Sequence, residues 1–149
     1  MSLLESLIKE TNNEFAALSA DMDDSYGFID TGSYALNALV SGSIYGGLPD
    51  SKCIGFAGEE ATGKSFFVLA AAKAFLDEHT DGMVAYFESE HALDKDTVAS
   101  RGSDMKRFAV LPVGSVEEFR TQAAKMLDKY RETPEGKRPR LMLDRKSVV

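Results

Sequence analysis

The sequence predicts an α/β fold with a mostly parallel sheet, flanked by helices and preceded by an N-terminal helix. Two observations predict this fold. Short apolar runs alternate with helical patterns between residues 52 and 144, and such alternation is typical of consecutive βαβ units with right-handed crossovers. A glycine-rich segment also joins the first apolar run to the first long helical pattern, as expected of a strand–loop–helix unit.

The expected core elements follow from periodicity and from helix start and stop signals. Strands are expected at residues 52–57, 83–88, 107–113 and 140–144, and helices at residues 64–78, 93–101 and 116–132. The last helix is the best defined, because Ser115 and Glu118 form a capping box and apolar residues then recur at helical spacing. It is expected to stop before Pro134 and Gly136.

A separate helix is expected at residues 2–19, where Ser2 and Glu5 form another capping box and apolar residues form one stripe. This stripe could pack on its own domain or on a neighbouring subunit. The acidic segment that follows marks the one plausible boundary. The chain is therefore divided into residues 1–26, an N-terminal oligomerisation helix with its linker, and residues 27–149, the core.

Length and composition are those of one globular domain. The chain has 149 residues, of which 44% are hydrophobic and 28% charged, enough to bury a core. No apolar run approaches membrane-spanning length, and the first residues lack a signal-peptide pattern. The single cysteine, Cys53, has no internal partner for a disulfide, so a reducing cytoplasm is the expected compartment. Its apolar surroundings predict a small core residue.

Charge is distributed unevenly along the chain. Residues 1–103 carry 17 acidic and 6 basic side chains, whereas residues 104–149 carry 7 acidic and 11 basic ones. One interpretation is a basic face for nucleic acid, and the other is a solvated helix surface. The second is favoured, because acidic residues are interspersed among the basic ones, although the cluster at residues 137–140 points the other way.

One segment matches the pattern G-x-x-x-x-G-K-[ST] of a phosphate-binding loop, the P-loop or Walker A motif. Its residues are Gly58, Glu59, Glu60, Ala61, Thr62, Gly63, Lys64 and Ser65. Backbone N–H groups of such a loop cradle phosphate oxygens at a helix N-terminus. Lys64 is then expected to reach the β- and γ-phosphates, and the Ser65 hydroxyl to bind Mg²⁺.

Two further strand ends carry carboxylates, at the edge of the sheet where α/β proteins bind ligands. Glu88 and Glu90 end the second strand, and we expect Glu90 to orient a water molecule at the γ-phosphate while Glu88 has a supporting role. His91 either senses phosphate or caps a loop. Asp144 ends an apolar strand as in a Walker B motif, where the carboxylate helps to hold Mg²⁺.

Three segments together resemble the RecA recombinase family. They are the lead-in at residues 29–49, the P-loop at residues 58–65, and the strand end at residues 86–94, which is the most specific of the three. The turn at residues 41–47 is similar to that of the phage, UvsX-like branch. The resemblance covers about residues 27–144.

The resemblance implies a RecA-like ATPase core that binds ATP and Mg²⁺, forms filaments on single-stranded DNA and promotes strand exchange in homologous recombination and DNA repair. In that family Glu90 would activate the attacking water and Asp94 would lie near the adenine. The helix at residues 2–19 would dock on the adjacent subunit.

Two departures from the family pattern bear on function. Thr97 stands where many bacterial members have an aromatic residue that stacks on adenine, so stacking is not expected there. After Asp144 the chain continues as Arg145-Lys146-Ser147-Val148-Val149, whereas the family continues with Ser and a long remainder that holds the DNA-binding loops. This difference predicts a shortened or frame-interrupted product with an incomplete sheet, so whether the chain is an active enzyme stays open.

Three functions are therefore considered. The first is a DNA-dependent ATPase of the RecA type. The second is a truncated nucleotide-binding half-core that binds ATP or caps filaments without strand exchange. The third, a small-molecule kinase, is ranked last because it needs an arginine-rich lid, and the two arginines considered for one, Arg101 and Arg107, do not form an arginine-rich segment.

Overall fold

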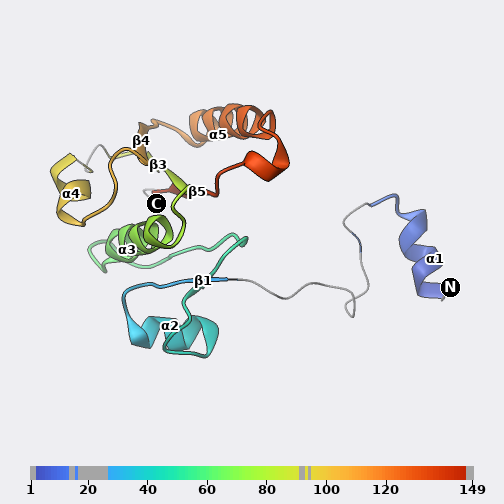
Figure 1. Ribbon diagram of the computed structural model, residues 1–149, viewed down its shortest axis with the longest axis horizontal. Coiled ribbons are helices and arrows are strands. Elements are labelled where there is room, and N and C mark those ends of the chain that lie inside the picture. The colour runs from blue at the N-terminus through green and yellow to red at the C-terminus, as the bar shows by residue number, and fades with distance from the viewer. Residues whose placement is uncertain (1–2, 14–15, 17–26, 91–92, 94, 147–149) are drawn as a thin grey trace.

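The computed structural model describes residues 3–13, 16, 27–90, 93 and 95–146. Two small units follow the N-terminal helix: a short antiparallel pair of strands joined through one helix, and a parallel sheet with helices on both faces (Figure 1). The elements are α1 (Leu3–Glu10), β1 (Phe28–Ile29), α2 (Tyr34–Ser41), β2 (Leu48–Pro49), α3 (Lys64–Glu78), β3 (Met83–Glu88), α4 (Lys95–Ser100), β4 (Phe108–Pro112), α5 (Val116–Arg131), the 3₁₀ turn η2 (Glu135–Lys137) and β5 (Leu141–Arg145).

The parallel sheet has the strand order β4-β3-β5, so β3 lies in the centre. Its register pairs Tyr86 with Val110 on one side and with Asp144 on the other. Because both faces of β3 are covered, its residues from Val84 to Glu88 are all buried. The predicted α/β class with parallel strands is therefore confirmed, and three of the four predicted strands form.

Alternate residues of β3 face two different helical layers. Val84 and Tyr86 belong to a core cluster built mainly with α3, whereas Ala85 and Phe87 belong to one built with Ala123 of α5. This two-residue alternation is the normal consequence of strand geometry. The sheet is thus the middle layer, with α3 on one face and α5 on the other.

The expected strand at residues 52–57 is wrong. These residues form no strand with any described part of the chain, and Cys53 is exposed rather than buried in the core. Ile54 is 39% exposed. An apolar run becomes a strand only when a neighbour pairs with its backbone N–H and C=O groups, and Gly55 further weakens the propensity of this run for extended structure.

A buried polar cluster holds together the unit formed by β1, α2 and β2, which precedes the parallel sheet. Thr31 and Asn37 are 0% and 1% exposed. The Asn37 amide oxygen accepts hydrogen bonds from the Thr31 backbone N–H at 3.1 Å and from its hydroxyl at 2.7 Å. The amide nitrogen donates to Asp30 at 2.8 Å and to the Ile44 carbonyl at 3.1 Å. The Asn37 side chain of α2 therefore joins the residues before this helix to Ile44 after it, in the segment that leads into β2.

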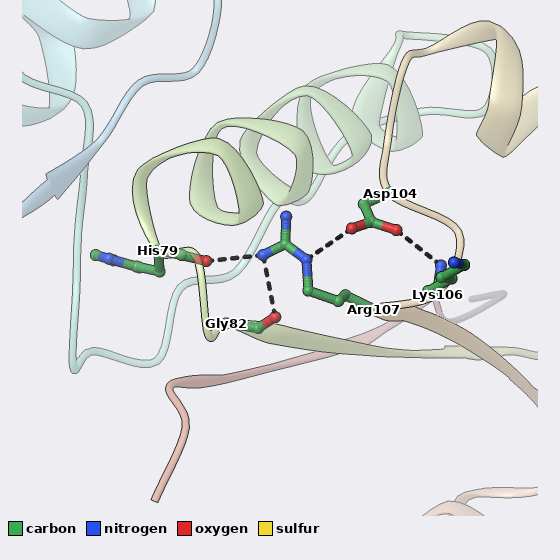
Figure 2. Close-up of polar contacts among 5 residues, drawn as sticks. All are labelled: His79, Gly82, Asp104, Lys106 and Arg107. Atoms are coloured by element: carbon green, nitrogen blue, oxygen red, sulfur yellow. Dashed lines mark hydrogen bonds and ion pairs between the residues drawn. The ribbon is translucent and has the colours of Figure 1, made fainter.

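An arginine links the two turns at the amino ends of β3 and β4 (Figure 2). Arg107 donates from Nη1 to the carbonyls of His79 at 2.8 Å and Gly82 at 3.4 Å, and from Nε to Asp104 at 2.9 Å. The Asp104 carboxylate also accepts from the Lys106 backbone N–H. Hydrogen bonds from Arg107 and then from Lys106 lower the pKa of Asp104. Arg107 therefore has a structural role at the opposite end of α3 from the P-loop, and does not act as a lid.

Helix α1 is shorter in the described part of the chain than the expected residues 2–19. It ends at Glu10 and buries none of its residues. Figure 1 shows it apart from the sheet. Ser2, residues 14–15 and residues 17–26 lie outside the described residues, so the expected capping box and the expected boundary at residue 26 lie there too. Searching the described residues reveals no helix long and apolar enough to cross a membrane.

Candidate nucleotide-binding site

The glycine-rich loop turns sharply before α3 through residues with positive φ. Gly63, the N-cap of α3, has φ +88°, and Ala61 has φ +59°. Glycine reaches this left-handed region without a steric penalty, whereas alanine does so at a cost. Alternation of such residues turns successive backbone N–H groups toward one side, which forms a cradle for an anion. The start of α3 at Lys64 adds the positive end of a helix dipole.

The Lys64 side chain reaches back to the first residues of this loop. Its ammonium donates hydrogen bonds to the carbonyls of Gly58 at 2.8 Å and Glu59 at 2.6 Å. The Thr62 hydroxyl also donates to the Glu59 carbonyl, at 2.8 Å. The side chains of Glu59 and Glu60 are exposed. An entering phosphate would therefore replace two neutral carbonyls as the partners of Lys64, a change that favours the charged ligand.

Ser65 lines one pocket together with Tyr86 of the central strand. The pKa of Tyr86 is raised to about 12 by burial and by the nearby charge of Asp144, while a hydrogen bond with the Ser65 side chain opposes the rise. Tyr86 and Asp144 are register partners on β3 and β5. Residues 65, 86 and 144 are thereby brought together from α3, β3 and β5.

Asp144 is a part-buried carboxylate. Burial raises its pKa to about 6, and a hydrogen bond from the Arg145 backbone opposes this rise. Within the described residues, no lysine or arginine forms an ion pair with Asp144. An ionised Asp144 would therefore be stabilised by a cation supplied from outside the chain.

The end of β3 holds two carboxylates of very different exposure. Glu88 is 2% exposed, and its Oε1 accepts a hydrogen bond from the Glu90 backbone N–H at 3.0 Å. Glu90 is 39% exposed and pairs with the ammonium of Lys146. The same ammonium lies 3.7 Å from Glu88 Oε1. Lys146 follows β5 directly, so the ends of two neighbouring strands meet here.

A pocket of about 170 Å³ opens beside these groups. Its lining residues come from α3, β3, α4 and the end of β5: Ser65, Phe66, Leu69, Tyr86, Leu93, Thr97, Arg101 and Lys146. The Arg101 guanidinium lies over the Phe66 ring, 4.4 Å from its centroid. The pocket thus combines apolar walls with two cationic side chains and the hydroxyl groups of Ser65 and Tyr86.

Comparison with known proteins gives matches over part of the chain. No family profile matches it. A recombination and repair protein of Enterobacteria phage T4 is 29% identical over 93 residues, 62% of this chain and 24% of that protein. Protein RecA of Pseudarthrobacter chlorophenolicus is 37% identical over 83 residues, 55% of this chain and 22% of that protein. Protein RecA of Malacoplasma penetrans is 28% identical over 127 residues, 84% of this chain and 36% of that protein.

The chain is related to the RecA recombination proteins. The aligned stretches span between 22% and 36% of the length of these curated relatives. A parallel three-stranded sheet flanked by helices and preceded by an N-terminal helix is compatible with part of a RecA-like core. The family resemblance noted in the sequence is thereby confirmed.

Three of the expected site residues of this RecA-related chain, Ser65, Glu90 and Asp144, lie close to the carboxyl ends of β3 and β5. Ser65 lines the pocket, Asp144 is the register partner of Tyr86, and Glu90 is joined to the pocket through Lys146. Asp94 and His91 lie outside the described residues. Two groups were missed from the sequence. The sequence gives Tyr86 no site role beyond its place in an apolar strand and in the segment 86–94, and it gives Lys146 only as part of a departure from the family pattern. A lysine two positions after a strand-end aspartate could have indicated Lys146.

Proposed function

We propose that this chain is the nucleotide-binding part of a RecA-type recombination and repair protein, which binds ATP with Mg²⁺ and hydrolyses ATP in response to single-stranded DNA. The observation that carries the proposal is the group formed by Ser65, Tyr86 and Asp144. It joins the start of the P-loop helix to the strand end that a Walker B carboxylate occupies. Support for the DNA-directed function comes from the names of the relatives, which are recombination proteins.

The proposed roles of the loop residues follow from their positions. Backbone N–H groups of residues 58–65 bind the phosphates, and Lys64 leaves the Gly58 and Glu59 carbonyls to contact the β- and γ-phosphates. Asp94, which is outside the described residues, is proposed to contact the adenine base, as the family resemblance of its motif implies. Glu90 orients the attacking water, which requires its carboxylate to be accessible, and it is 39% exposed.

The donor set fits a magnesium ion. Asp144 is a part-buried carboxylate that lacks a cationic partner within the described residues. It is the register partner of Tyr86, which lines one pocket with Ser65. Carboxylate, hydroxyl and phosphate oxygens are the ligands that Mg²⁺ prefers. When bound, the ion would neutralise charge on the β- and γ-phosphates. Ser65 and Asp144 would hold it, and Tyr86 would orient Ser65.

Association with further copies is proposed for α1. Leu3, Leu4 and Leu7 are 78%, 57% and 56% exposed, so one helix presents three large apolar side chains that the described core does not cover. Docking of α1 on an adjacent copy would bury them, as the resemblance to filament-forming proteins implies. Leu4→Asp is expected to lower the average mass measured by light scattering.

A second candidate is a unit that binds ATP without DNA-dependent turnover. The observation that favours it is the ion pair between Glu90 and Lys146, since a carboxylate held by an ammonium is less available to a water molecule. This candidate shares the P-loop, so nucleotide binding does not distinguish it from the first.

ATP turnover by the purified chain, measured with and without single-stranded DNA, tests the proposal. Lys64→Ala is the binding-site variant, and Lys129→Ala on exposed α5 is the matched control. Turnover that DNA stimulates and that Lys64→Ala abolishes is expected. Equal turnover with and without DNA would contradict the recombinase assignment. Lys64-dependent binding without turnover would establish the second candidate instead.

A further inference from the structure

Lys146 is held at the end of β5 by backbone as well as side-chain contacts. Its backbone N–H donates to the Phe87 carbonyl at 2.9 Å, and its carbonyl accepts a hydrogen bond from the Ser89 hydroxyl at 3.4 Å. Its ammonium pairs with Glu90 and lies 3.7 Å from Glu88. Position 146 is therefore fixed against the end of β3, and the direction of its side chain is set by two carboxylates.

The same side chain also lines the pocket beside the P-loop. Lys146 and Ser65 share that pocket, with Tyr86 between the strand end and the start of α3. Only 24% of the Lys146 side chain is exposed. The ammonium thus lies on the border between the carboxylates of β3 and the space next to Ser65, and it has three donors on a flexible four-carbon stem.

We propose that Lys146 exchanges partners when a nucleoside triphosphate binds, moving from the Glu90 carboxylate to the terminal phosphate. This inference rests on the proposed nucleotide-binding function. A terminal phosphate beside Ser65 is a more highly charged acceptor than one carboxylate, and charge-assisted hydrogen bonds to phosphate are strong. Once the Lys146 ammonium has moved to the phosphate, the Glu90 carboxylate is available to orient water.

A nucleoside diphosphate lacks the terminal phosphate, so with it the pair between Lys146 and Glu90 remains closed. Lys146 is in this sense a positioning residue, because it releases Glu90 only when the third phosphate is present. The exchange leaves Glu88 with the hydrogen bond from the Glu90 backbone N–H at 3.0 Å, so the buried carboxylate keeps a partner in both states. Lys146 and Glu90 would in this way distinguish ATP from ADP without any contribution from DNA.

The test compares equilibrium binding of ADP and of a non-hydrolysable ATP analogue, both with Mg²⁺, to the full chain by calorimetry. The variants are Lys146→Met, Lys146→Arg, Glu90→Gln and the double variant Lys146→Met/Glu90→Gln. Lys129→Met is the control, because Lys129 forms a similar ion pair with Glu132 on exposed α5. The quantity compared is the ratio of the affinity for the analogue to the affinity for ADP.

Lys146→Met is expected to lower this ratio about tenfold. This factor corresponds to the strength of the Lys146 hydrogen bond to the phosphate minus that of the pair with Glu90 that it replaces. Lys146→Arg is expected to keep most of the ratio, and Lys129→Met to leave it unchanged. Glu90→Gln is expected to raise the ratio, and to raise it less when Lys146 is already Met. That coupling is specific to an exchange of partners, because like-charge repulsion from Glu90 alone would act equally in both backgrounds.

Three results would overturn the inference. One is an unchanged ratio in Lys146→Met, and another is an effect of Glu90→Gln that is the same in both backgrounds. The third is the absence of binding of either nucleotide to the wild-type chain, which would overturn the proposed function as well. Binding of ADP that Lys64→Ala abolishes, with an unchanged ratio in Lys146→Met, would overturn this inference alone. Should Lys146→Met fail to fold, Glu90→Gln and Lys146→Arg still give the ratio.

Discussion

Tyr86 on β3 lies directly beside Asp144 on β5, and it lines one pocket with Ser65 at the start of α3. Three elements that are separate in sequence therefore meet at one buried phenol. Burial and the charge of Asp144 both raise the pKa of Tyr86, to about 12. Tyr86 is thus a neutral phenol at neutral pH, and it lies where the start of the P-loop helix meets the strand end that carries the part-buried carboxylate of Asp144.

Asp144→Asn is expected to stabilise the metal-free protein above pH 6. The folded-state pKa of Asp144 is raised to about 6 from an ordinary 3.8, so the folded state binds the proton more tightly than the unfolded state does. Wild-type stability therefore falls as pH rises from about 4 to about 6 and then levels off. The expected gain from Asn is on the order of 2 kcal/mol at pH 8 and smaller at pH 5.

Urea unfolding with a chelator at pH 5 and pH 8 measures this difference. Asp128→Asn, on the exposed surface of α5, serves as the control and is expected to have the same small effect at both pH values. A gain from Asp144→Asn that is equal at the two pH values would contradict the prediction.

Gly63→Ala is expected to destabilise the loop without any steric clash. Gly63 has φ +88°, and an added Cβ would meet no atom within 4 Å, so only the backbone conformation penalises alanine. That penalty is about 1–2 kcal/mol, and nucleotide affinity should fall with it. Ala61→Gly is the reverse change at φ +59° and is expected to preserve nucleotide affinity. Binding of ADP to the two variants measures both effects, and equal losses would argue against a role for these conformations.

Arg107→Ala is expected to separate the turns that Figure 2 shows joined. It removes the donors to the His79 and Gly82 carbonyls and to Asp104, with an expected loss of about 1–3 kcal/mol in the free energy of unfolding. Lys106→Ala is the matched control, because the hydrogen bond that Lys106 donates in this group comes from its backbone N–H, which the substitution keeps. Thermal unfolding followed by circular dichroism compares the two, and similar melting temperatures would refute the assignment.

Asn37→Asp is expected to destabilise the protein strongly, although the two side chains have nearly the same size. The side-chain nitrogen donates to the Asp30 carboxylate and to the Ile44 carbonyl, and a carboxylate can do neither. It would also place a second negative charge beside Asp30, whose pKa is lowered by the hydrogen bonds from Asn37 and Gly32. The expected loss is about 2–4 kcal/mol, the range for an uncompensated buried group. Asn37→Asp should recover stability at acidic pH, and a pH-independent loss would contradict this reasoning.

Local signals in the sequence predicted the elements that surround the candidate site. Helix α3 and strand β3 have the predicted bounds of 64–78 and 83–88, because a glycine start and an uninterrupted apolar run are local properties. The capping residue Ser115 likewise predicted the start of α5, and its hydroxyl accepts a hydrogen bond from the Glu118 backbone N–H at 3.1 Å. The parallel order β4-β3-β5 was not predicted, since strand order depends on contacts between distant segments.

The sequence by itself determined the α/β class, the P-loop and the carboxylates at the ends of β3 and β5, because each depends on residues close together in the chain. Only the tertiary structure decided that residues 52–57 form no strand, since a strand needs a partner for its backbone. It also decided that Tyr86 lies beside Asp144 and lines a pocket with Ser65, and that Lys146 pairs with Glu90 across 56 positions of sequence. The physical reason is the same in each case. Hydrogen bonds and ion pairs between distant segments form only after the sheet has set the register that brings those segments together.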